Sequence, residues 1–424
     1  MRILFYLILM AGFGNTVLRP EIENPYTLYR FIAPIGFLIV FSFRPMMVVK
    51  SLGVFILFVA YNFALATAYS GDYSQLLPSL VHYFYLFILL VLVMGMKARY
   101  ADFERQFIRF IQGFYLFLLA NLFIELFIGS YYPNLYVDET DESSLRAFYW
   151  NQNDLAVVLC VVAWICLAFD RFKGQVRNIV VVLTLLILFY NDSKAALLSF
   201  VGISVPAFMS MRVVAKTRVS RGVWFVLFGS LGVLAVLVLM QVSTIDIQFA
   251  NDTYSIEDLL IRPITGILQL ESSGEAWGSL NNRMDAAVFV IIEYINSLGF
   301  GLGAGGSWLV LTLPQYELGG AQSPHNALLQ FTVDFGYPVL VGYLVLLYGA
   351  VRKLFTPNLD ENERLKVIAV LSFPLLGLSQ SGAIVTNYFF FAAVYFIWLL
   401  GRDAPFAGPS RHQEPAGRLA DESP

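Results

Sequence analysis

Charged residues are scarce in this sequence. Only 13% of the 424 residues are Asp, Glu, Lys or Arg, about half the share usual in a soluble globular protein. Cysteine is nearly absent: Cys160 and Cys166 share one apolar run, at a spacing that does not bring them to one helix face. This argues against a disulfide framework or a cysteine-based metal centre. The net charge of -3 says nothing about nucleic acid, but the sequence shows no basic patch and no RNA- or DNA-binding motif, so no nucleic-acid partner is expected.

The apolar residues that dominate the sequence form long runs. Hydrophobic residues make up 58% of the chain, and the mean hydropathy is +0.69. A helix needs about 20 mainly apolar residues to cross a hydrocarbon core about 30 Å thick. The sequence therefore predicts an all-α, polytopic integral membrane bundle with about 12 spanning helices. The predicted spans are residues 3–18, 27–43, 51–69, 77–96, 107–129, 154–169, 178–190, 195–211, 222–241, 327–351, 365–380 and 382–400.

The lysines and arginines are divided unevenly between alternate loops. If the N-terminus is cytoplasmic, only six of the 27 fall on the outer side, and the other 21 fall on the inner side. Cytoplasmic loops are enriched in these residues, so the pattern predicts a multi-pass protein with both termini in the cytoplasm. The six outer cations are Arg19, Arg30, Arg146, Lys194, Arg262 and Arg283.

We expect one membrane domain, residues 1–401, followed by a cytoplasmic tail, residues 402–424. The tail is rich in Pro, Gly and charge and is predicted to be disordered. The membrane domain includes a long outer loop at 242–326. In this loop, Ser255-Ile256-Glu257-Asp258 has the pattern of a capping box and predicts a short helix. A second short helix is predicted after Arg283, lying against the membrane surface or packed on the bundle.

A glycine-rich run occupies residues 299–306 of the outer loop. Backbone without side chains lets N–H groups approach an anion closely, so the run is a candidate anion site. The alternative interpretation is a flexible turn. The run is not a dinucleotide fingerprint, because no βαβ unit surrounds it.

The sequence contains three histidines in different contexts. His412 lies in the predicted tail, and His82 lies near the outer end of an apolar span. His325 directly precedes the predicted span 327–351 on its outer side. It is either a structural residue at a helix start or a functional imidazole in the region where the outer cations could converge.

Four sequence blocks together resemble the O-antigen ligase and Wzy-type polymerase superfamily. Ser323-Pro324-His325-Asn326, followed by Gly336-Tyr337-Pro338, is similar to its His-Asn signature. The other three blocks occur in the same order as in the superfamily, and all four cover residues 146–343. They are the segment from Arg146 to Asn151-Gln152-Asn153, the segment Asn191-Asp192-Ser193-Lys194-Ala195, and Asn282-Arg283 with the run from Gly299 to Gly303.

This sequence departs from the superfamily pattern in three ways. Lys194 stands where the superfamily usually has arginine, Gln152 stands where it has proline, and the glycine usual between Arg146 and the Asn151-Gln152-Asn153 segment is missing. Lysine can neutralise a phosphate as a point charge but cannot form a bidentate contact.

The resemblance implies a glycosyltransferase-type enzyme of the bacterial inner (plasma) membrane. Such an enzyme transfers a glycan from an undecaprenyl-diphosphate carrier to an acceptor hydroxyl at the outer face. We favour polymerisation of O-antigen or exopolysaccharide repeat units. The implied partners are the lipid-linked oligosaccharide, a glycan or lipid A core acceptor and the bilayer, with a chain-length regulator or other assembly protein as a further candidate.

The resemblance also implies the roles of individual residues. His325 would be the general base, since an imidazole ordinarily titrates near pH ~6.5. Arg283 would neutralise the departing diphosphate. No metal and no cofactor are expected. The residues predicted to bind substrate are Arg146, Lys194, Asn153, Asn326, Gly301 and Gly303.

Two alternatives remain open at the level of sequence. The first is an O-antigen ligase that joins a finished glycan to a lipid A core or to protein. The second belongs to another class, a lipid-linked oligosaccharide flippase or secondary transporter. Asp334, inside the predicted span 327–351, is the main feature that would suit a transporter.

Overall fold

The protein is described from a computed structural model, and its described residues are almost entirely helical. They are residues 3, 6–7, 9–10, 28–69, 71–129, 145–149, 152–169, 171–172, 174–191, 193–209, 246–249, 252–255, 278–313, 326–354, 356 and 359–376.

The N-terminal half of the chain forms helices that follow the predicted spans in order. The predicted spans from 27–43 to 195–211 each coincide with one helix. These helices are α2 (Leu28–Phe43), α3 (Pro45–Tyr69), α4 (Leu76–Arg99), α5 (Phe103–Ile128), α6 (Gln152–Ala168), α7 (Gly174–Tyr190) and α8 (Lys194–Met209).

The C-terminal half is less regular. A hairpin of β1 (Asp246–Phe249) and β2 (Asp252–Ser255) precedes the remaining described helices. These helices are α12 (Gly278–Asn296), α13 (Gly306–Leu311), α14 (Ala327–Phe335), α15 (Tyr337–Leu354) and α16 (Glu361–Ser372).

The helix lengths support a helical membrane protein but not the count of about 12 spans. Among the described residues, four helices are long and apolar enough to cross a bilayer: α3, α4, α5 and α15. Four further apolar helices are shorter, at Ala33–Phe43, Gln152–Ala168, Gly174–Tyr190 and Ala196–Val205. The predicted spans 222–241 and 382–400, most of 3–18 and the tail 402–424 lie outside the described residues.

One prediction for the C-terminal half was wrong. The predicted span 327–351 is interrupted at Gly336, whose φ of 74° is left-handed and divides it into α14 and α15. The described residues are otherwise helical apart from the short hairpin, in which β1 and β2 pair antiparallel with Asp246 opposite Ser255. Ser255 ends β2, and residues 256–277, where a short helix was predicted, lie outside the described residues.

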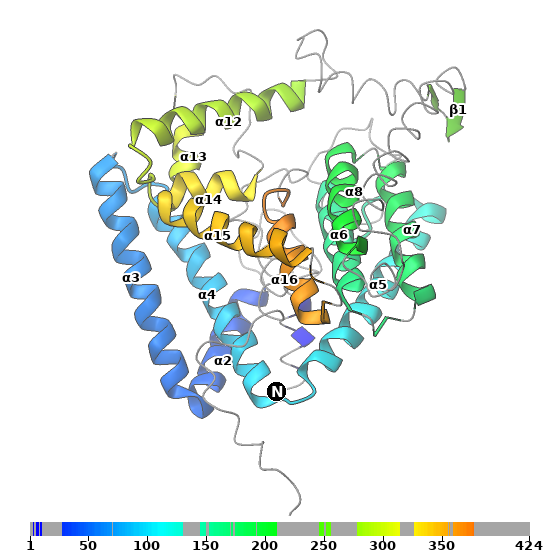
Figure 1. Cartoon of the computed structure of the whole chain (residues 1–424), viewed down its shortest axis with the longest axis horizontal. Helices are drawn as coiled ribbons and strands as arrows, with labels where there is room; N and C mark the ends of the chain where they lie inside the picture. Colours follow the sequence, from blue (N-terminus) through cyan, green and yellow to red (C-terminus); the bar gives the residue numbers. More distant parts are fainter. Residues whose placement is uncertain are drawn as a thin grey trace, which may run out of the picture.

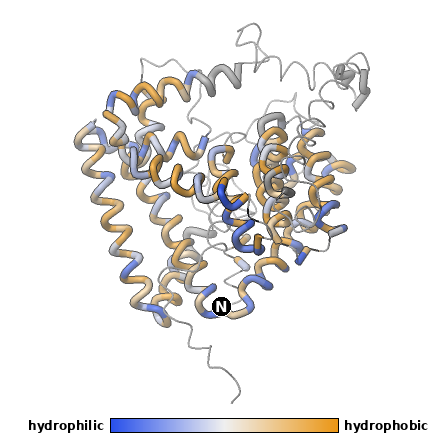
Figure 2. The backbone as a smooth tube through the Cα atoms, in the orientation of Figure 1, coloured by the Kyte–Doolittle hydropathy of each residue, from blue (hydrophilic) through white to orange (hydrophobic). Residues whose placement is uncertain are grey.

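Helix α6 lies at the centre of the bundle. Every residue from Asp154 to Ala168 is buried, as expected for a helix that is apolar on all sides. Helices α7, α8 and α16 pack around it. By contrast, α3 and α15 expose large apolar side chains such as Leu57 and Val345, which suits a lipid environment. Figure 2 shows hydrophobic residues along most of the helices and hydrophilic residues concentrated near helix ends and on α16.

Basic side chains gather at the end of the bundle that contains the turn from α4 to α5. Arg44 donates to the carbonyl oxygen of Ala98 at 3.5 Å. Arg171 lies 3.6 Å from Glu104 at the start of α5. The cation Arg99 lies over the ring of Phe43. These contacts tie the ends of several helices together at one rim.

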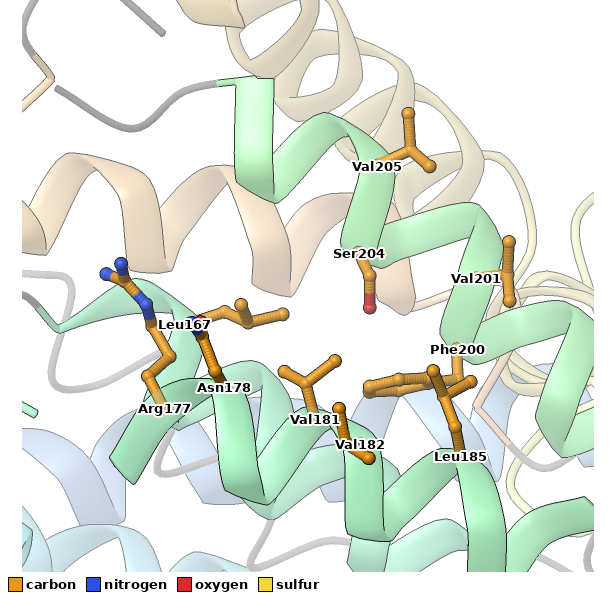
Figure 3. Close-up of a pocket in the computed structure, with 10 residues that line it drawn as sticks. All are labelled: Leu167, Arg177, Asn178, Val181, Val182, Leu185, Phe200, Val201, Ser204 and Val205. Carbon is orange, nitrogen blue, oxygen red and sulfur yellow. The ribbon is translucent and has the colours of Figure 1, made fainter. Parts of the chain in front are cut away.

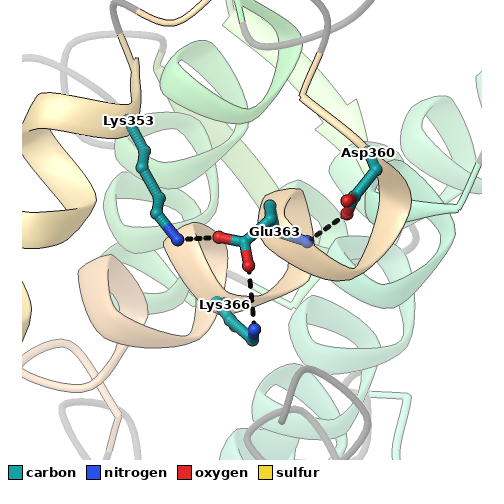
Figure 4. A network of polar contacts seen from close by, with 4 residues as sticks. All are labelled: Lys353, Asp360, Glu363 and Lys366. Carbon is teal, nitrogen blue, oxygen red and sulfur yellow. Dashed lines mark hydrogen bonds and ion pairs between the residues drawn. The ribbon is translucent and has the colours of Figure 1, made fainter. Parts of the chain in front are cut away.

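The start of α16 belongs to the same basic rim. Glu363 contacts Lys353 at the end of α15 and accepts a hydrogen bond from Lys366 at 2.8 Å (Figure 4). Asp360 caps the helix by accepting the N–H of Glu363 at 2.8 Å. Beside them the fully buried Arg364 donates to the carbonyl oxygen of Ala168 at 3.0 Å. This bond joins α16 to the end of the central helix.

Helix α12 lies across the opposite end of the bundle (Figure 1). It packs on α13 and α14, as predicted for a short helix of the outer loop. Tyr69, at the end of α3, donates a hydrogen bond to Glu293 of α12. Asn296 donates to the same carboxylate oxygen at 3.2 Å. The end of α12 is therefore anchored to the end of α3.

Candidate functional site

The glycine-rich run at 299–306 forms a tight turn against the end of α14. The N–H of Leu302 donates to the carbonyl oxygen of Val333 at 2.9 Å, and that of Gly303 donates to the carbonyl oxygen of Asp334 at 2.9 Å. The run is thus paired with α14 through backbone hydrogen bonds, which a flexible turn would lack.

Two fully buried side chains hold the rest of this turn. Asn62 of α3 accepts the N–H of Ala304 at 2.6 Å. The carboxylate of Asp334 accepts the N–H of Ser307 at 2.8 Å and that of Gly305 at 3.3 Å. Backbone N–H groups at a helix start have no intrahelical partner. The side-chain oxygens of Asp334 therefore lie against the glycine-rich run and accept these N–H groups.

Close packing explains why glycines are needed here. Gly301 has a φ of 92°, and a Cβ atom on it would lie 2.6 Å from the backbone nitrogen of Gly336. A Cβ on Gly336 would lie 2.1 Å from the carbonyl oxygen of Phe300. Both positions exclude a side chain. Substrate binding by Gly301 and Gly303 stays a prediction, next to this structural role.

Arg146 lies in a short buried segment, residues 145–149, that precedes α6. Arg146 is only 7% exposed. The neighbouring Ala147 has a φ of 51°, which is uncommon for a residue other than glycine. Phe148 stacks on Phe117 of α5, with 5.4 Å between the ring centroids. The cation is therefore held within the bundle instead of on an open loop.

Side chains from two helices bind the backbone of this segment. Glu125, in the last turn of α5, accepts the N–H of Arg146 at 2.8 Å and that of Ala147 at 2.6 Å. Asn191, directly after α7, accepts the N–H of Leu145 at 3.0 Å and donates to its carbonyl oxygen at 2.7 Å. Both side chains are buried, so the segment is fixed from two sides.

The start of α14 is defined by Asn326. Its side-chain oxygen accepts the N–H of Leu329 at 2.9 Å and so caps the helix. The N–H of Ala327 donates to the carbonyl oxygen of Leu376 at 2.9 Å. His325 directly precedes this cap but lies outside the described residues. Its role as the base stays a prediction.

The other predicted site residues are described only in part. Asn153 is the second residue of α6 and is half-buried. Lys194 begins α8, and Arg283 lies in α12, but their side chains lie outside the description. Arg146, Asn153 and Lys194 therefore share the part of the bundle around α6 and α8.

Gly301, Gly303 and Asn326 belong to a second part of the bundle, around α14. Both parts lie at the end of the bundle that α12 crosses (Figure 1). The structure thus brings the predicted substrate-binding residues to one end, on two different sets of helices.

One apolar pocket lies away from these residues, between α7 and α8 (Figure 3). Its volume is about 390 Å³, and Phe200 and Val181 are among its lining residues. Arg177 and Asn178 lie at one end of it (Figure 3). No predicted site residue lines it, so it does not serve as the polar site.

Within the described ranges, no group of three or more His, Cys, Asp or Glu residues could hold a metal ion. The expectation that the protein uses neither a metal nor a cofactor stays a prediction.

Sequence reasoning missed three buried polar residues of this region: Glu125, Asn62 and Asn191. Glu125 was a detectable candidate, because a lone carboxylate inside the predicted span 107–129 is a functional hypothesis by default. Asn191 lies in a block that resembles the superfamily, but only Lys194 of that block had been given a role. Asn62 carries no sequence signal beyond being a polar residue in an apolar helix.

Comparison with known proteins places the similarity in the centre of the chain. Residues 179–344 match a family model described as O-antigen ligase. The teichuronic acid biosynthesis protein TuaE of Bacillus subtilis is 27% identical over 257 residues, which cover 57% of this chain and 48% of the relative. The chain thus spans about half the length of this curated relative. No solved structure matches the chain.

Proposed function

We propose that the protein transfers a glycan from a lipid-linked donor to an acceptor hydroxyl, on the premise that its central region, which matches the O-antigen ligase family model, acts as that family does. The family match confirms the resemblance predicted from the four sequence blocks. The proposed donor is an undecaprenyl-diphosphate-linked oligosaccharide, and the proposed reaction is polymerisation of envelope polysaccharide repeat units.

The family match at 179–344 is the observation that carries this proposal. The matched region contains most of the residues predicted for the site, including the two predicted catalytic residues, His325 and Arg283. The other predicted site residues within it are Lys194, Gly301, Gly303 and Asn326.

The proposed chemistry assigns one task to the cations and another to the imidazole. Positive charge must neutralise the diphosphate as it leaves the anomeric carbon, and Arg283 and Arg146 are proposed to do this with Lys194. The acceptor hydroxyl must lose its proton as it attacks, and His325 is proposed to accept it, which contributes about 10²–10⁴ in rate. The burial of Arg146 supports its proposed role in binding the diphosphate, because the attraction between opposite charges is stronger where water is excluded.

The proposed setting is the bacterial inner membrane, with the reaction at its outer face. The basic rim formed by Arg44, Arg171 and their neighbours would face the cytoplasm. The end that α12 crosses would then face outward. We further propose that the shorter apolar helices and the spans outside the described residues complete about 12 crossings, with both termini inside.

The ligase alternative differs only in the acceptor, which would be a lipid A core or a protein instead of a growing glycan. The transporter alternative loses support at Asp334. Both of its carboxylate oxygens accept backbone N–H groups, from Gly305 and Ser307. A carboxylate committed to backbone in this way is a structural ligand instead of an ion carrier.

One reconstitution experiment separates these functions. The purified protein in lipid is given a labelled undecaprenyl-diphosphate oligosaccharide and no other enzyme. A ladder of lengthened products supports the polymerase. Product formed only after a lipid A core or a protein is added supports the ligase. Movement of intact donor between leaflets, without new products, would overturn the enzyme proposal.

Arg283→Ala gives a residue-level check of the same proposal. We expect slower use of the labelled donor at low donor concentration, because the charge on the departing diphosphate is less well neutralised. An unchanged apparent donor affinity and rate would contradict the role assigned to Arg283.

A further inference from the structure

The backbone around Arg146 is bound more tightly than a connection between two helices requires. Residues 145–147 make four hydrogen bonds to the side chains of Glu125 and Asn191. Glu125, which accepts two of these bonds, belongs to α5, and Asn191, which accepts one and donates one, directly follows α7. The position of this segment is therefore set by tertiary contacts and not by the chain that leads into it.

Glu125 would be an unfavourable residue in its position without these bonds. It is 4% exposed and lies in the mainly apolar C-terminal half of α5, where a buried carboxylate is costly unless its oxygens are hydrogen-bonded. Its Oε2 atom accepts two consecutive N–H groups at 2.8 and 2.6 Å. Hydrogen bonds to an ionised acceptor are about twice as strong as neutral ones.

The conformation of Ala147 shows that the segment is constrained. Its φ of 51° is left-handed, and a residue other than glycine keeps such a conformation only where the surroundings impose it. Two contacts hold this conformation in place. The N–H of Ala147 donates to Glu125, and the ring of Phe148 packs against Phe114 and Phe117.

We propose that Glu125 and Asn191 are positioning residues, which fix the backbone at Arg146 so that its guanidinium meets the diphosphate of the lipid-linked donor. This inference rests on the proposed function, in which Arg146 binds that diphosphate. Displacing a binding group by about 1 Å can cost about 10²-fold in activity. Attaching the backbone at Arg146 to two helices would therefore keep the guanidinium at the position that diphosphate binding requires.

The test measures binding of undecaprenyl diphosphate, without a sugar, to the full chain in lipid nanodiscs. The variants are Glu125→Ala, Glu125→Gln, Asn191→Ala, Arg146→Ala and the double variant Glu125→Ala with Arg146→Ala. The matched control is Asn121→Ala, one turn earlier on α5, where the exposed side chain donates to the carbonyl oxygen of Phe117 in its own helix. Thermal unfolding of each variant is recorded separately.

We expect Arg146→Ala, Glu125→Ala and Asn191→Ala each to weaken binding by about 10-fold or more, the loss expected from one charge-assisted contact. Glu125→Gln should lose less than Glu125→Ala, because an amide oxygen still accepts an N–H. The control should bind as the parent protein does. The double variant should bind no more weakly than Arg146→Ala alone, because Glu125 acts through Arg146.

The outcomes separate the two proposals. If Arg146→Ala weakens binding but Glu125→Ala and Asn191→Ala do not, the positioning role is wrong and the donor site stands. Additive losses in the double variant would also overturn it. If Arg146→Ala binds normally, the donor role of Arg146 fails and the positioning role fails with it. Should Glu125→Ala not fold, Glu125→Gln and Asn191→Ala test the same segment from its two sides.

Discussion

The carboxylate of Asp334 and the backbone N–H of Ser307 lie 2.8 Å apart, and their hydrogen bond joins the end of α14 to the start of α13. Both residues are fully buried. The same carboxyl group accepts the N–H of Gly305, so the glycine-rich turn is closed by a side chain of the protein itself. Because α14 begins at Ala327, two residues after His325 in the sequence, this contact also helps to fix the helix that follows the proposed base.

Replacing Asp334 tests this internal contact. Asp334→Ala would leave two buried N–H groups without their acceptor, at a cost of about 1–3 kcal/mol each. We expect a clear fall in the thermal unfolding temperature of the protein in nanodiscs. Asp72→Ala is the control, since Asp72 is exposed and accepts the N–H of Ser74, two residues later. Equal unfolding temperatures for the two variants would show that the contact does not stabilise the fold.

A pair of glycine substitutions separates close packing from ordinary helix propensity. Gly336→Ala places a Cβ atom 2.1 Å from the carbonyl oxygen of Phe300, and overpacking of this kind costs about 1–3 kcal/mol. Gly342→Ala, six residues later on α15, meets nothing within 4 Å. The second change should raise stability slightly, by about 0.5–1 kcal/mol. Unfolding temperatures that moved in the same direction would argue against the packing account.

Arg364 is predicted to be a structural cation. It is fully buried and donates to the carbonyl oxygens of Ala168 and Leu359 at 3.0 and 3.3 Å. Hydrogen bonds from a charged group contribute about 1.5–3 kcal/mol each, so Arg364→Met should lower the unfolding temperature. Arg352→Met, at an exposed position on α15, is the control. Loss of donor binding without loss of stability would instead place Arg364 in the functional site.

The proposed base is tested with a matched histidine. His325→Ala should abolish glycan transfer while the protein still inserts into the membrane and binds undecaprenyl diphosphate. The reason is that the attacking hydroxyl loses its proton acceptor while the cations remain. His412→Ala, in the predicted tail, should retain transfer. Normal product ladders from the His325 variant would remove His325 as the base.

Much of the helical framework could be predicted from the sequence because it depends on local composition. The helices from α2 to α8 coincide with apolar runs of sufficient length, and the helix after Arg283 was also predicted. The family was predicted from short motifs such as that around His325 and Asn326. The number of membrane crossings was harder to predict from the sequence, because α6 and α7 each have only 17 residues. Length alone does not decide whether such helices span a bilayer.

The details of the candidate site depended on contacts between residues far apart in the chain. Asn62 and Ala304, which are hydrogen-bonded, are separated by 242 positions in the sequence, and Asn191 and Leu145 by 46. No local sequence pattern predicts such pairs. The strand that ends at Ser255 was missed for the same reason, because a strand in this hairpin is defined by its pairing with residues 246–249.

By itself, the sequence determined that this protein belongs in a bilayer, where its helices lie along the chain and which family its central region resembles, since hydrophobic run length and motif order are properties of the chain alone. Only the tertiary structure decided that the helix from Ala327 breaks at Gly336, that Asp334 fills the glycine-rich turn, and that Glu125 holds the segment of Arg146. Those outcomes depend on which backbone groups meet a buried partner in space.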